Sequence, residues 1–175
     1  AQKIVSKVEN RFVNLKTVKP SALACEYSLK TDKDPRLVEL ILGESKGVIR
    51  HRKGVLVVEN HQGLIMANAG IDHSNVEQDS DNDWVLLLPE NPDKSAKALH
   101  RELLYITGCK IGIIINDSIG RAWRNGTIGT AIGVAGLSSI IDLRGRSDLF
   151  GNLLRVSEEA IADELASAAS LIQGQ

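Results

Sequence analysis

Short apolar runs bounded by glycine, proline, asparagine or charged residues predict the strands. Six such runs lie at residues 1–6, 55–59, 63–68, 84–88, 111–115 and 130–137. The second and third runs flank a polar turn at His61-Gln62, which favours a β-hairpin. The last run is rich in glycine and alanine, a composition that permits close approach of another backbone.

Three segments show the periodicity of amphipathic helices. They lie at residues 34–44, 93–107 and 157–172. Asp34 is expected to cap the first helix, with Pro35 in its first turn, and Ser157 is expected to cap the third. Gly108 is expected to end the second helix. Strands, hairpin-like pairs and helices mixed in this way predict an α+β fold, with mixed or antiparallel sheets and flanking helices.

Length and composition indicate an ordinary globular chain. The 175 residues suffice for one domain or two small ones, and 43% of them are hydrophobic. A net charge of −1 and an aromatic content of 3% give no support to nucleic-acid binding.

Two cysteines are too few for a disulfide scaffold. We expect Cys25 and Cys109 to be free, buried thiols in a reducing compartment. The sequence contains neither an apolar stretch of about 18 residues nor a signal peptide, so it predicts a cytoplasmic protein without membrane association. Because the chain opens without Met and ends directly after a helical pattern, we expect it to be a fragment of a longer protein.

The segment from Ile114 to Thr127 carries the strongest chemical signal. The apolar run stops at Asn116-Asp117-Ser118, so a buried strand is expected to deliver a carboxylate and a hydroxyl to a sheet edge. Both are hard oxygen ligands suited to Mg²⁺ or Mn²⁺. Arg121 and Arg124 follow and suit an anionic substrate. The alternative is a strand-end turn capped by Asp117.

A second segment repeats this arrangement. The strand-like run that ends near Met66 is followed by Asp72, with Asn75 three residues further on. Two acids at the ends of two apolar runs can meet around one or two cations. Lys7 is a candidate phosphate contact, with an exposed structural lysine as the alternative. No Walker loop, dinucleotide-binding glycine motif or nucleophile elbow occurs in the sequence.

Three charged segments have simpler interpretations. Arg50 to Lys53 reads as a solvated turn, and the acidic residues 77–83 as a surface loop. The segment from Asp142 to Gly151 is either an internally paired loop or part of a site near Arg121 and Arg124.

Several motifs in a fixed order resemble one known family. They are Lys3-Ile-Val-Ser-Lys-Val-Glu9, Lys33-Asp-Pro-Arg36, Ile41-Leu-Gly-Glu-Ser45, Ala67-Asn-Ala-Gly-Ile-Asp-His-Ser-Asn75, Asn116-Asp-Ser-Ile-Gly-Arg-Ala-Trp-Arg124, Ala131-Ile-Gly-Val-Ala-Gly136, Asp142-Leu-Arg-Gly145 and Ala162-Asp-Glu-Leu-Ala166. Over essentially the whole chain, the sequence resembles the coenzyme F420-0:L-glutamate ligase family, also called F420 gamma-glutamyl ligases.

The resemblance implies an enzyme that joins L-glutamate to the deazaflavin precursor F420-0 through a gamma-linked amide, at the expense of GTP. It also implies Mn²⁺ or Mg²⁺, a monovalent cation such as K⁺, an unusual α+β fold and a homodimer. The implied metal ligands are Asp72, Asp117 and Ser118. The implied GTP contacts are Gln2, Lys3, Lys7, Asn75, Gln173 and Gly174.

The chain departs from the family pattern at three positions. Asn10 stands where the family usually has glycine, Ser118 where threonine is common, and Ala122 where proline is common. Family members also run longer at both ends. We therefore expect residues 1–175 to form one ligase unit from a longer chain, with a possible sub-domain at about residues 60–150.

The expected chemistry begins with attack of the substrate carboxylate on the γ-phosphate of GTP. The acyl phosphate would then be displaced by the amine of glutamate. Asp72 and Asp117 would act through the metal, and Arg121 and Arg124 would hold an anionic group. The alternatives are a related ligase with another acidic acceptor and a non-catalytic module that binds nucleotide or coenzyme.

Overall fold

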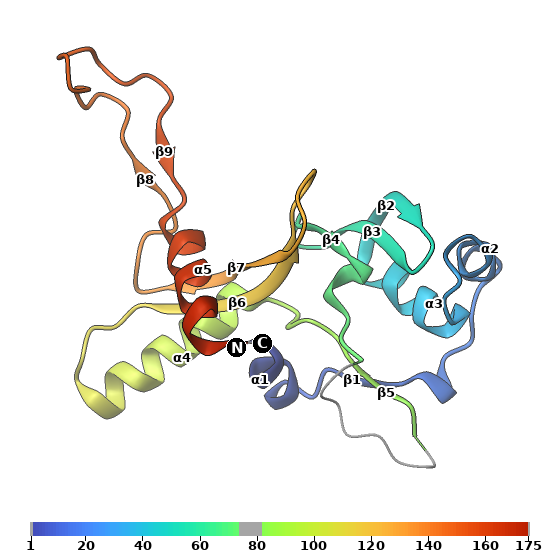
Figure 1. Cartoon of the computed structure of the whole chain (residues 1–175). Helices are drawn as coiled ribbons and strands as arrows, with labels where there is room; N and C mark the ends of the chain where they lie inside the picture. The colour runs from blue at the N-terminus through green and yellow to red at the C-terminus, as the bar shows by residue number, and fades with distance from the viewer. Residues whose placement is uncertain (1, 74–81, 175) are drawn as a thin grey trace. The chain divides into compact units, whose positions relative to one another are not determined.

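The computed structural model describes residues 2–73 and 82–174. The chain divides into two compact units, Ala1–Glu90 and Asn91–Gln175. Within the described residues, α-helices accompany four small antiparallel sheets, which confirms the predicted α+β class (Figure 1). None of the described helices has the length and apolar character needed to cross a membrane.

The first unit contains three α-helices and two sheets among its described residues. Its elements are α1 (Gln2–Val8), β1 (Phe12–Asn14), η1 (Leu15–Thr17), α2 (Ala22–Thr31), α3 (Pro35–Gly43), β2 (Ser45–Arg52), β3 (Val55–Asn60), β4 (Ile65–Ala67), η2 (Asn68–Gly70) and β5 (Trp84–Leu86). Strands β2, β3 and β4 form one sheet in that order, and β1 pairs with β5. The predicted hairpin of β3 and β4 is confirmed.

Helices α2 and α3 pack together beside strand β2 and supply half of a buried hydrophobic cluster in this unit (Figure 1). The buried side chains of this cluster are Ala24, Val38, Ile41, Leu56, Val58 and Ala69. As predicted, Asp34 caps α3 and Pro35 occupies its first turn, with the Asp34 carboxylate accepting a hydrogen bond from the N–H of Arg36 at 2.8 Å.

The strand predicted at residues 1–6 is wrong, because residues 2–6 lie in helix α1. Its buried side chains are Gln2 and Ser6, which are four residues apart and therefore share one helix face. The apolar side chain of Ile4 is exposed instead. The apolar positions of this segment thus do not mark its buried face.

Asn10 ends α1 in a left-handed conformation, with φ of 54°. The N–H of Asn10 donates to the carbonyl of Lys7, and the N–H of Arg11 donates to the carbonyl of Ser6. This is the Schellman arrangement, which usually has glycine at the left-handed position. Asparagine tolerates that conformation better than other residues with a β-carbon, so the departure at position 10 leaves the helix end intact.

A left-handed turn at residues 68–70 precedes Asp72. Asn68, Ala69 and Gly70 all have φ between 53° and 70°. A β-carbon at Gly70 would approach the side chains of Met66 and Leu88 to less than 3 Å, so the turn is also tightly packed. Beyond the turn, the backbone of Asp72 exchanges two hydrogen bonds with Leu86, at 2.9 and 2.8 Å.

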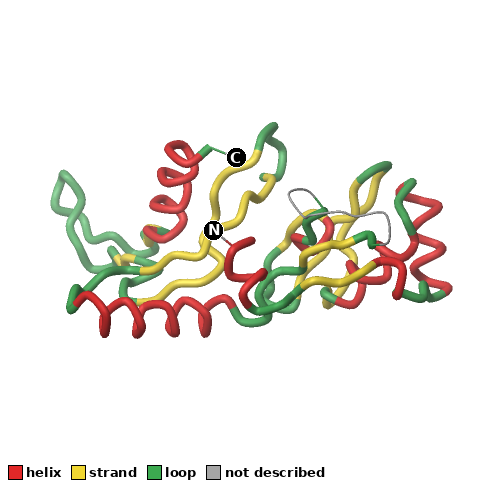
Figure 2. The backbone as a smooth tube through the Cα atoms, turned by 90° about the horizontal axis from the view of Figure 1, so that it is seen from below, coloured by secondary structure: helices red, strands yellow, loops and turns green. Residues whose placement is uncertain are grey.

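The second unit is built on a long antiparallel hairpin. Its elements are α4 (Pro92–Thr107), β6 (Ile113–Gly120), β7 (Thr127–Ala135), β8 (Ile141–Asp142), β9 (Glu158–Glu159) and α5 (Ile161–Gln173). Helices α4 and α5 both pack on the ribbon of β6 and β7 (Figures 1 and 2). Gly108 ends α4 in a left-handed conformation, as predicted.

Glycines on β7 let both helices approach the ribbon. A β-carbon at Gly129 would overlap the backbone of Ala166 on α5, and one at Gly133 would overlap the backbone of Pro92 on α4. The close backbone approach predicted for this strand is therefore confirmed. The register of the β6–β7 pairing shifts between Ile115, which lies opposite Gly133, and Asn116, which lies opposite Ala131.

Carboxylates in the first turns of both helices also bind this strand. The N–H of Val134 donates to Asp93 at 2.9 Å, and the N–H of Ala131 donates to Asp163 at 2.8 Å. A negative charge is favourable at a helix N-terminus, so each carboxylate stabilises its helix and its contact with the strand together.

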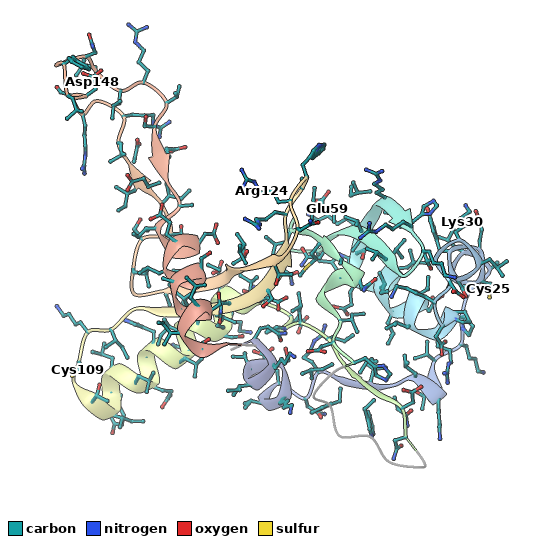
Figure 3. The ribbon with its side chains drawn as sticks, in the orientation of Figure 1. Cys25, Lys30, Glu59, Cys109, Arg124 and Asp148 are labelled. Carbon is teal, nitrogen blue, oxygen red and sulfur yellow. The ribbon has the colours of Figure 1, made fainter. Side chains whose placement is uncertain are left out.

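Three local predictions for the remaining chain are wrong. Helix α5 begins at Ile161, and Ser157 does not cap it, since the residues that follow Ser157 pair as β9 with β8. Strand β6 continues to Gly120 instead of stopping at residue 115. Cys25 and Cys109 are free but exposed (Figure 3).

Candidate functional site

The carboxylate of Asp72 is paired with a lysine side chain in this structure. The Lys3 ammonium forms an ion pair with Oδ2 of Asp72. The Asp72 side chain is 15% exposed and that of Lys3 is 36% exposed, so the pair is partly removed from water. Two residues predicted to bind different groups, a metal and GTP, are thus in contact within the first unit.

The backbone fixes both partners of this ion pair. Lys3 lies on α1, whose end is closed by the hydrogen bonds around Asn10. Asp72 is held by its two backbone hydrogen bonds to Leu86. A carboxylate held in this way is suited to bind a cation at a fixed position.

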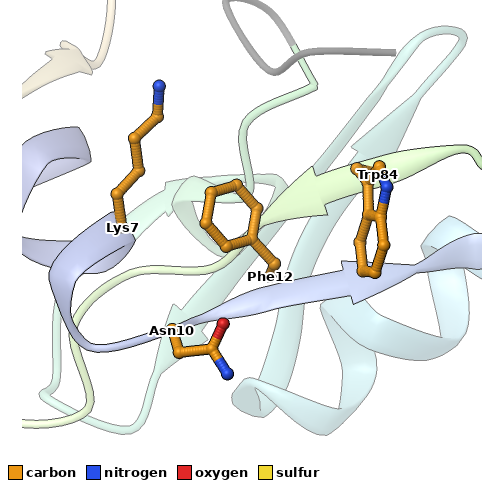
Figure 4. Close-up of a pocket in the computed structure, with 4 residues that line it drawn as sticks. All are labelled: Lys7, Asn10, Phe12 and Trp84. Atoms are coloured by element: carbon orange, nitrogen blue, oxygen red, sulfur yellow. The ribbon is translucent and has the colours of Figure 1, made fainter. Parts of the chain in front are cut away.

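A pocket of about 460 Å³ opens in the same unit. Among the described residues it is lined by Lys7, Asn10, Phe12 and Trp84 (Figure 4). Phe12 and Trp84 lie on paired strands β1 and β5, and their rings meet edge to face with centroids 6.3 Å apart. The pocket combines aromatic surface with an ammonium and an amide.

Lys7, which was predicted to contact a phosphate, lines this pocket. Asn10, Phe12 and Trp84 were not predicted as site residues. The sequence offers one weak signal for them, because aromatic residues are rare in this chain and two of them occur here. Their proximity depends on the pairing of β1 with β5, whose strands lie about 70 positions apart in the chain.

Asp117 and Ser118 lie inside strand β6, opposite Thr130 and Gly129. Oδ1 of Asp117 accepts a hydrogen bond from the backbone N–H of Ser118 at 2.8 Å. Consecutive side chains of a regular strand leave opposite faces, so a site that uses both residues requires two cations or a local twist of the backbone.

The two arginines lie where the β6–β7 hairpin reverses, between Gly120 and Thr127 (Figure 3). Arg121 donates from Nη2 to the carbonyl of Asn125 at 2.9 Å, which braces the turn. Trp123 is 88% exposed and has φ of 62°, a rare conformation for a bulky residue. The turn therefore presents an indole and the Arg124 guanidinium to solvent.

The remaining predicted nucleotide contacts are scattered over the chain. Gln2 is buried and accepts a hydrogen bond from the Ser6 hydroxyl at 3.4 Å. Gln173 is the last residue of α5, and Gly174 caps that helix with φ of 72°. Asn75 lies outside the described residues.

The arginine-rich segment after Asp142 is internally paired. Arg144 forms ion pairs with Asp142 at 2.7 Å and Glu158 at 3.1 Å. The Arg144 guanidinium lowers the pKa of Asp142 to about 2. Of the two interpretations left open for this segment, the paired loop is the one that the structure shows.

The predicted metal ligands are divided between the two units, with Asp72 in the first and Asp117 and Ser118 in the second. Within the described residues, no three His, Cys, Asp or Glu side chains gather in a group that could hold a metal ion. Their joint coordination of a cation stays a prediction. The chemistry of the predicted donors suits a divalent cation, since carboxylate and hydroxyl oxygens are ligands that Mg²⁺ and Mn²⁺ prefer.

Comparison with known proteins places the chain in a family. The family model described as F420-0:Gamma-glutamyl ligase matches residues 1–175. The chain belongs to this family.

Relatives in the gamma-glutamyl ligase family match the chain over its full length or nearly so. Proteins named coenzyme F420:L-glutamate ligase are 40% identical in Methanocaldococcus jannaschii and 47% identical in Methanothermobacter thermautotrophicus, each over 175 residues and 68% of the relative. The Archaeoglobus fulgidus protein of the same name is 40% identical over 172 residues, which is 98% of this chain and 67% of that relative.

Proposed function

We propose that this gamma-glutamyl ligase family member joins L-glutamate to coenzyme F420-0 through a gamma-linked amide, with cleavage of GTP to GDP and phosphate. The observation that carries the proposal is the family match across all 175 residues, together with relatives named for this ligation.

Most of the proposed nucleotide contacts belong to the first unit. The pocket offers aromatic surface from Phe12 and Trp84 for a flat base, and the Lys7 ammonium for an anionic group. Gln2, Lys3, Asn75, Gln173 and Gly174 complete the proposed GTP contacts. Lys3 and Lys7 lie four residues apart on α1, so their side chains share one face of the helix.

A divalent cation, Mn²⁺ or Mg²⁺, would be held by the carboxylates of Asp72 and Asp117 and the hydroxyl of Ser118. Hard oxygen donors of this kind match both ions. When bound, the cation would screen the negative charges of the nucleotide phosphates. K⁺ is proposed as an additional monovalent ion.

The chain's own residues would position the reactants. Lys3 and Lys7 would hold phosphate oxygens, and Arg121 and Arg124 would hold an anionic group of the coenzyme precursor or of glutamate. In the first step a carboxylate oxygen of F420-0 attacks the γ-phosphorus, and GDP leaves. In the second step the glutamate amine attacks the acyl carbon, and phosphate leaves with the former carboxylate oxygen.

The proposal includes assembly and location. We propose a homodimer that acts in the cytoplasm on small molecules, without nucleic-acid or membrane partners.

The decisive experiment combines the purified protein with F420-0, L-glutamate, GTP and Mn²⁺, and follows the coenzyme by mass spectrometry. A GTP-dependent mass increase of one or more glutamyl residues, abolished by Asp117→Ala, would support both the reaction and the metal ligand. GTP binding without any mass increase would contradict the ligase and indicate a binding module. A mass increase only with another acidic acceptor would contradict the assigned substrate.

A further inference from the structure

The ion pair between Lys3 and Asp72 joins a proposed nucleotide contact to a proposed metal ligand. Both side chains are described in this structure, and the ammonium contacts Oδ2 of the carboxylate directly. Because Asp72 is only 15% exposed, its charge is poorly screened by water and is favoured by a cationic partner. Lys3 therefore supplies positive charge at the place where the proposed metal would supply it.

An ammonium and a divalent cation compete for this oxygen. Both are positively charged, and at contact distance their repulsion would oppose joint binding. A divalent cation that coordinates Asp72 through Oδ2 would therefore weaken this ion pair and favour the release of Lys3. The affinity of the nucleotide-free protein for the metal is lowered by the stability of the ion pair that is broken.

Displacement leaves Lys3 close to the second positive residue of α1. Lys3 and Lys7 are separated by one helical turn on the same face, and Lys7 lines the pocket. A phosphate held by Lys7 would offer the released ammonium a new anionic partner. Nucleotide binding would then lower the free energy needed to free Asp72, and by linkage metal binding would strengthen nucleotide binding equally.

We propose that Lys3 is an exchangeable counterion, which neutralises Asp72 in the empty protein and transfers to the nucleotide phosphates when a divalent cation takes its place. This inference rests on the proposed function, because it requires Asp72 to bind metal and the α1 face to bind an anionic nucleotide. It makes Lys3 a positioning and coupling residue, since metal occupancy of Asp72 depends on where Lys3 lies.

The test compares Lys3→Gln with the unmodified protein by titration with Mn²⁺ alone, with free Mn²⁺ measured by electron paramagnetic resonance. Without the competing ammonium, Lys3→Gln is expected to bind Mn²⁺ about threefold to tenfold more tightly, the range expected for a partly buried ion pair. Calorimetric titration with a non-hydrolysable GTP analogue, without metal, is expected to show weaker binding by Lys3→Gln. Tighter binding of Mn²⁺ together with weaker binding of the nucleotide analogue separates exchange from general destabilisation, which would weaken both.

Three further variants control the result. Lys46→Gln removes the same charge from a surface pair in the same unit, where Lys46 lies 3.1 Å from Glu59, and it should leave Mn²⁺ affinity unchanged. Lys3→Arg keeps the cation and should retain the affinity of the unmodified protein. Adding Asp72→Asn to Lys3→Gln should abolish the gain.

The outcomes distinguish this inference from the proposed function. If the unmodified protein binds Mn²⁺ and the GTP analogue but Lys3→Gln binds Mn²⁺ no more tightly, the counterion role is overturned and the ligase proposal stands. If the unmodified protein binds neither Mn²⁺ nor the GTP analogue, both are overturned together. A gain that persists with Asp72→Asn would place the effect elsewhere and overturn the exchange.

Discussion

Gly129 on β7 lies against the carbonyl of Ala166 on α5, so closely that a β-carbon at residue 129 would overlap that oxygen. The Ser167 hydroxyl, one residue further along α5, donates to the carbonyl of Gly129 at 2.7 Å. The backbone of the strand and the backbone of the helix are therefore in direct contact, with no side chain between them.

Gly129→Ala is expected to lower the free energy of unfolding of this unit by about 2 kcal/mol or more, because neither backbone can yield without breaking hydrogen bonds. Chemical denaturation followed by circular dichroism would measure the loss. Gly120→Ala on the same hairpin is the matched control, since no atom lies within 4 Å of the added carbon. Equal stability of the two variants would contradict the close contact.

The cap of α3 gives a second prediction. Asp34→Ala removes the acceptor for the N–H of Arg36 and should destabilise the first unit by about 1 kcal/mol. Asp34→Asn keeps a capping oxygen and should recover most of that stability, although it loses the ion pair with Arg36. Thermal unfolding of both variants would compare them. A loss as large in Asp34→Asn as in Asp34→Ala would show that the charge matters and the cap does not.

The pairing of Asp142 with Arg144 predicts a specific pH dependence. The pKa of Asp142 is lowered from 3.8 to about 2, chiefly by the hydrogen bond from the Arg144 side chain. The pKa of Asp142 is lower in the folded protein than in the unfolded chain. The pairing therefore stabilises the folded segment around β8 and β9 above pH 3.8, and this stabilisation is lost as the pH falls through about 2. Carboxyl carbon shifts followed by NMR would measure the titration.

Arg144→Gln should return the Asp142 pKa towards 3.8. Arg146 lies between β8 and β9, and Arg146→Gln serves as the control that should leave the titration of Asp142 unchanged. An Asp142 carboxyl that titrates near 3.8 in the unmodified protein would contradict the hydrogen-bonded pair.

Arg124 tests whether the turn between β6 and β7 binds an anionic substrate. Arg124→Ala is expected to raise the KM of one anionic substrate about tenfold, as expected for loss of one charged hydrogen bond of roughly 1.4 kcal/mol. Steady-state kinetics with F420-0 and with L-glutamate varied separately would identify which one. Arg144→Ala is the control, since its guanidinium is already paired with two acids. Unchanged kcat and KM for both substrates in Arg124→Ala would remove Arg124 from the site.

Local signals predicted much of the fold where they agree with the tertiary structure. The cap at Asp34, the stop at Gly108 and the hairpin of β3 and β4 all follow from short-range backbone preferences. The glycine-rich strand β7 was predictable for a similar reason, because small residues in a strand mark a place where another backbone approaches.

The errors occur where tertiary contacts override those signals. Ser157 and the two glutamates after it have the composition of a helix start, yet Ser157 accepts a hydrogen bond from Leu143 and the glutamates pair with β8. In α1 the buried positions are polar, so hydrophobic periodicity could not reveal the helix. Strand β6 passes through Asp117 because β7 continues to pair with it.

The candidate site was predicted from the resemblance more than from spacing. The contact between Lys3 and Asp72 joins residues 69 positions apart and depends on a left-handed turn and an isolated bridge. The pocket residues Phe12 and Trp84 depend on a strand pairing of similar range. No local pattern encodes such pairings, which is why these contacts had to come from the structure.

The chain between β8 and β9 extends away from the body of the second unit (Figure 1), and its tip carries two apolar side chains. Leu149 is 98% exposed and Phe150 is 90% exposed, while backbone N–H groups bonded to the Asp148 carboxylate fix the tip. Exposed apolar tips of this kind promote association between molecules. The consequence is practical: high protein concentration and salts that strengthen apolar burial, such as sulfate, will promote self-association in storage and in crystallisation trials.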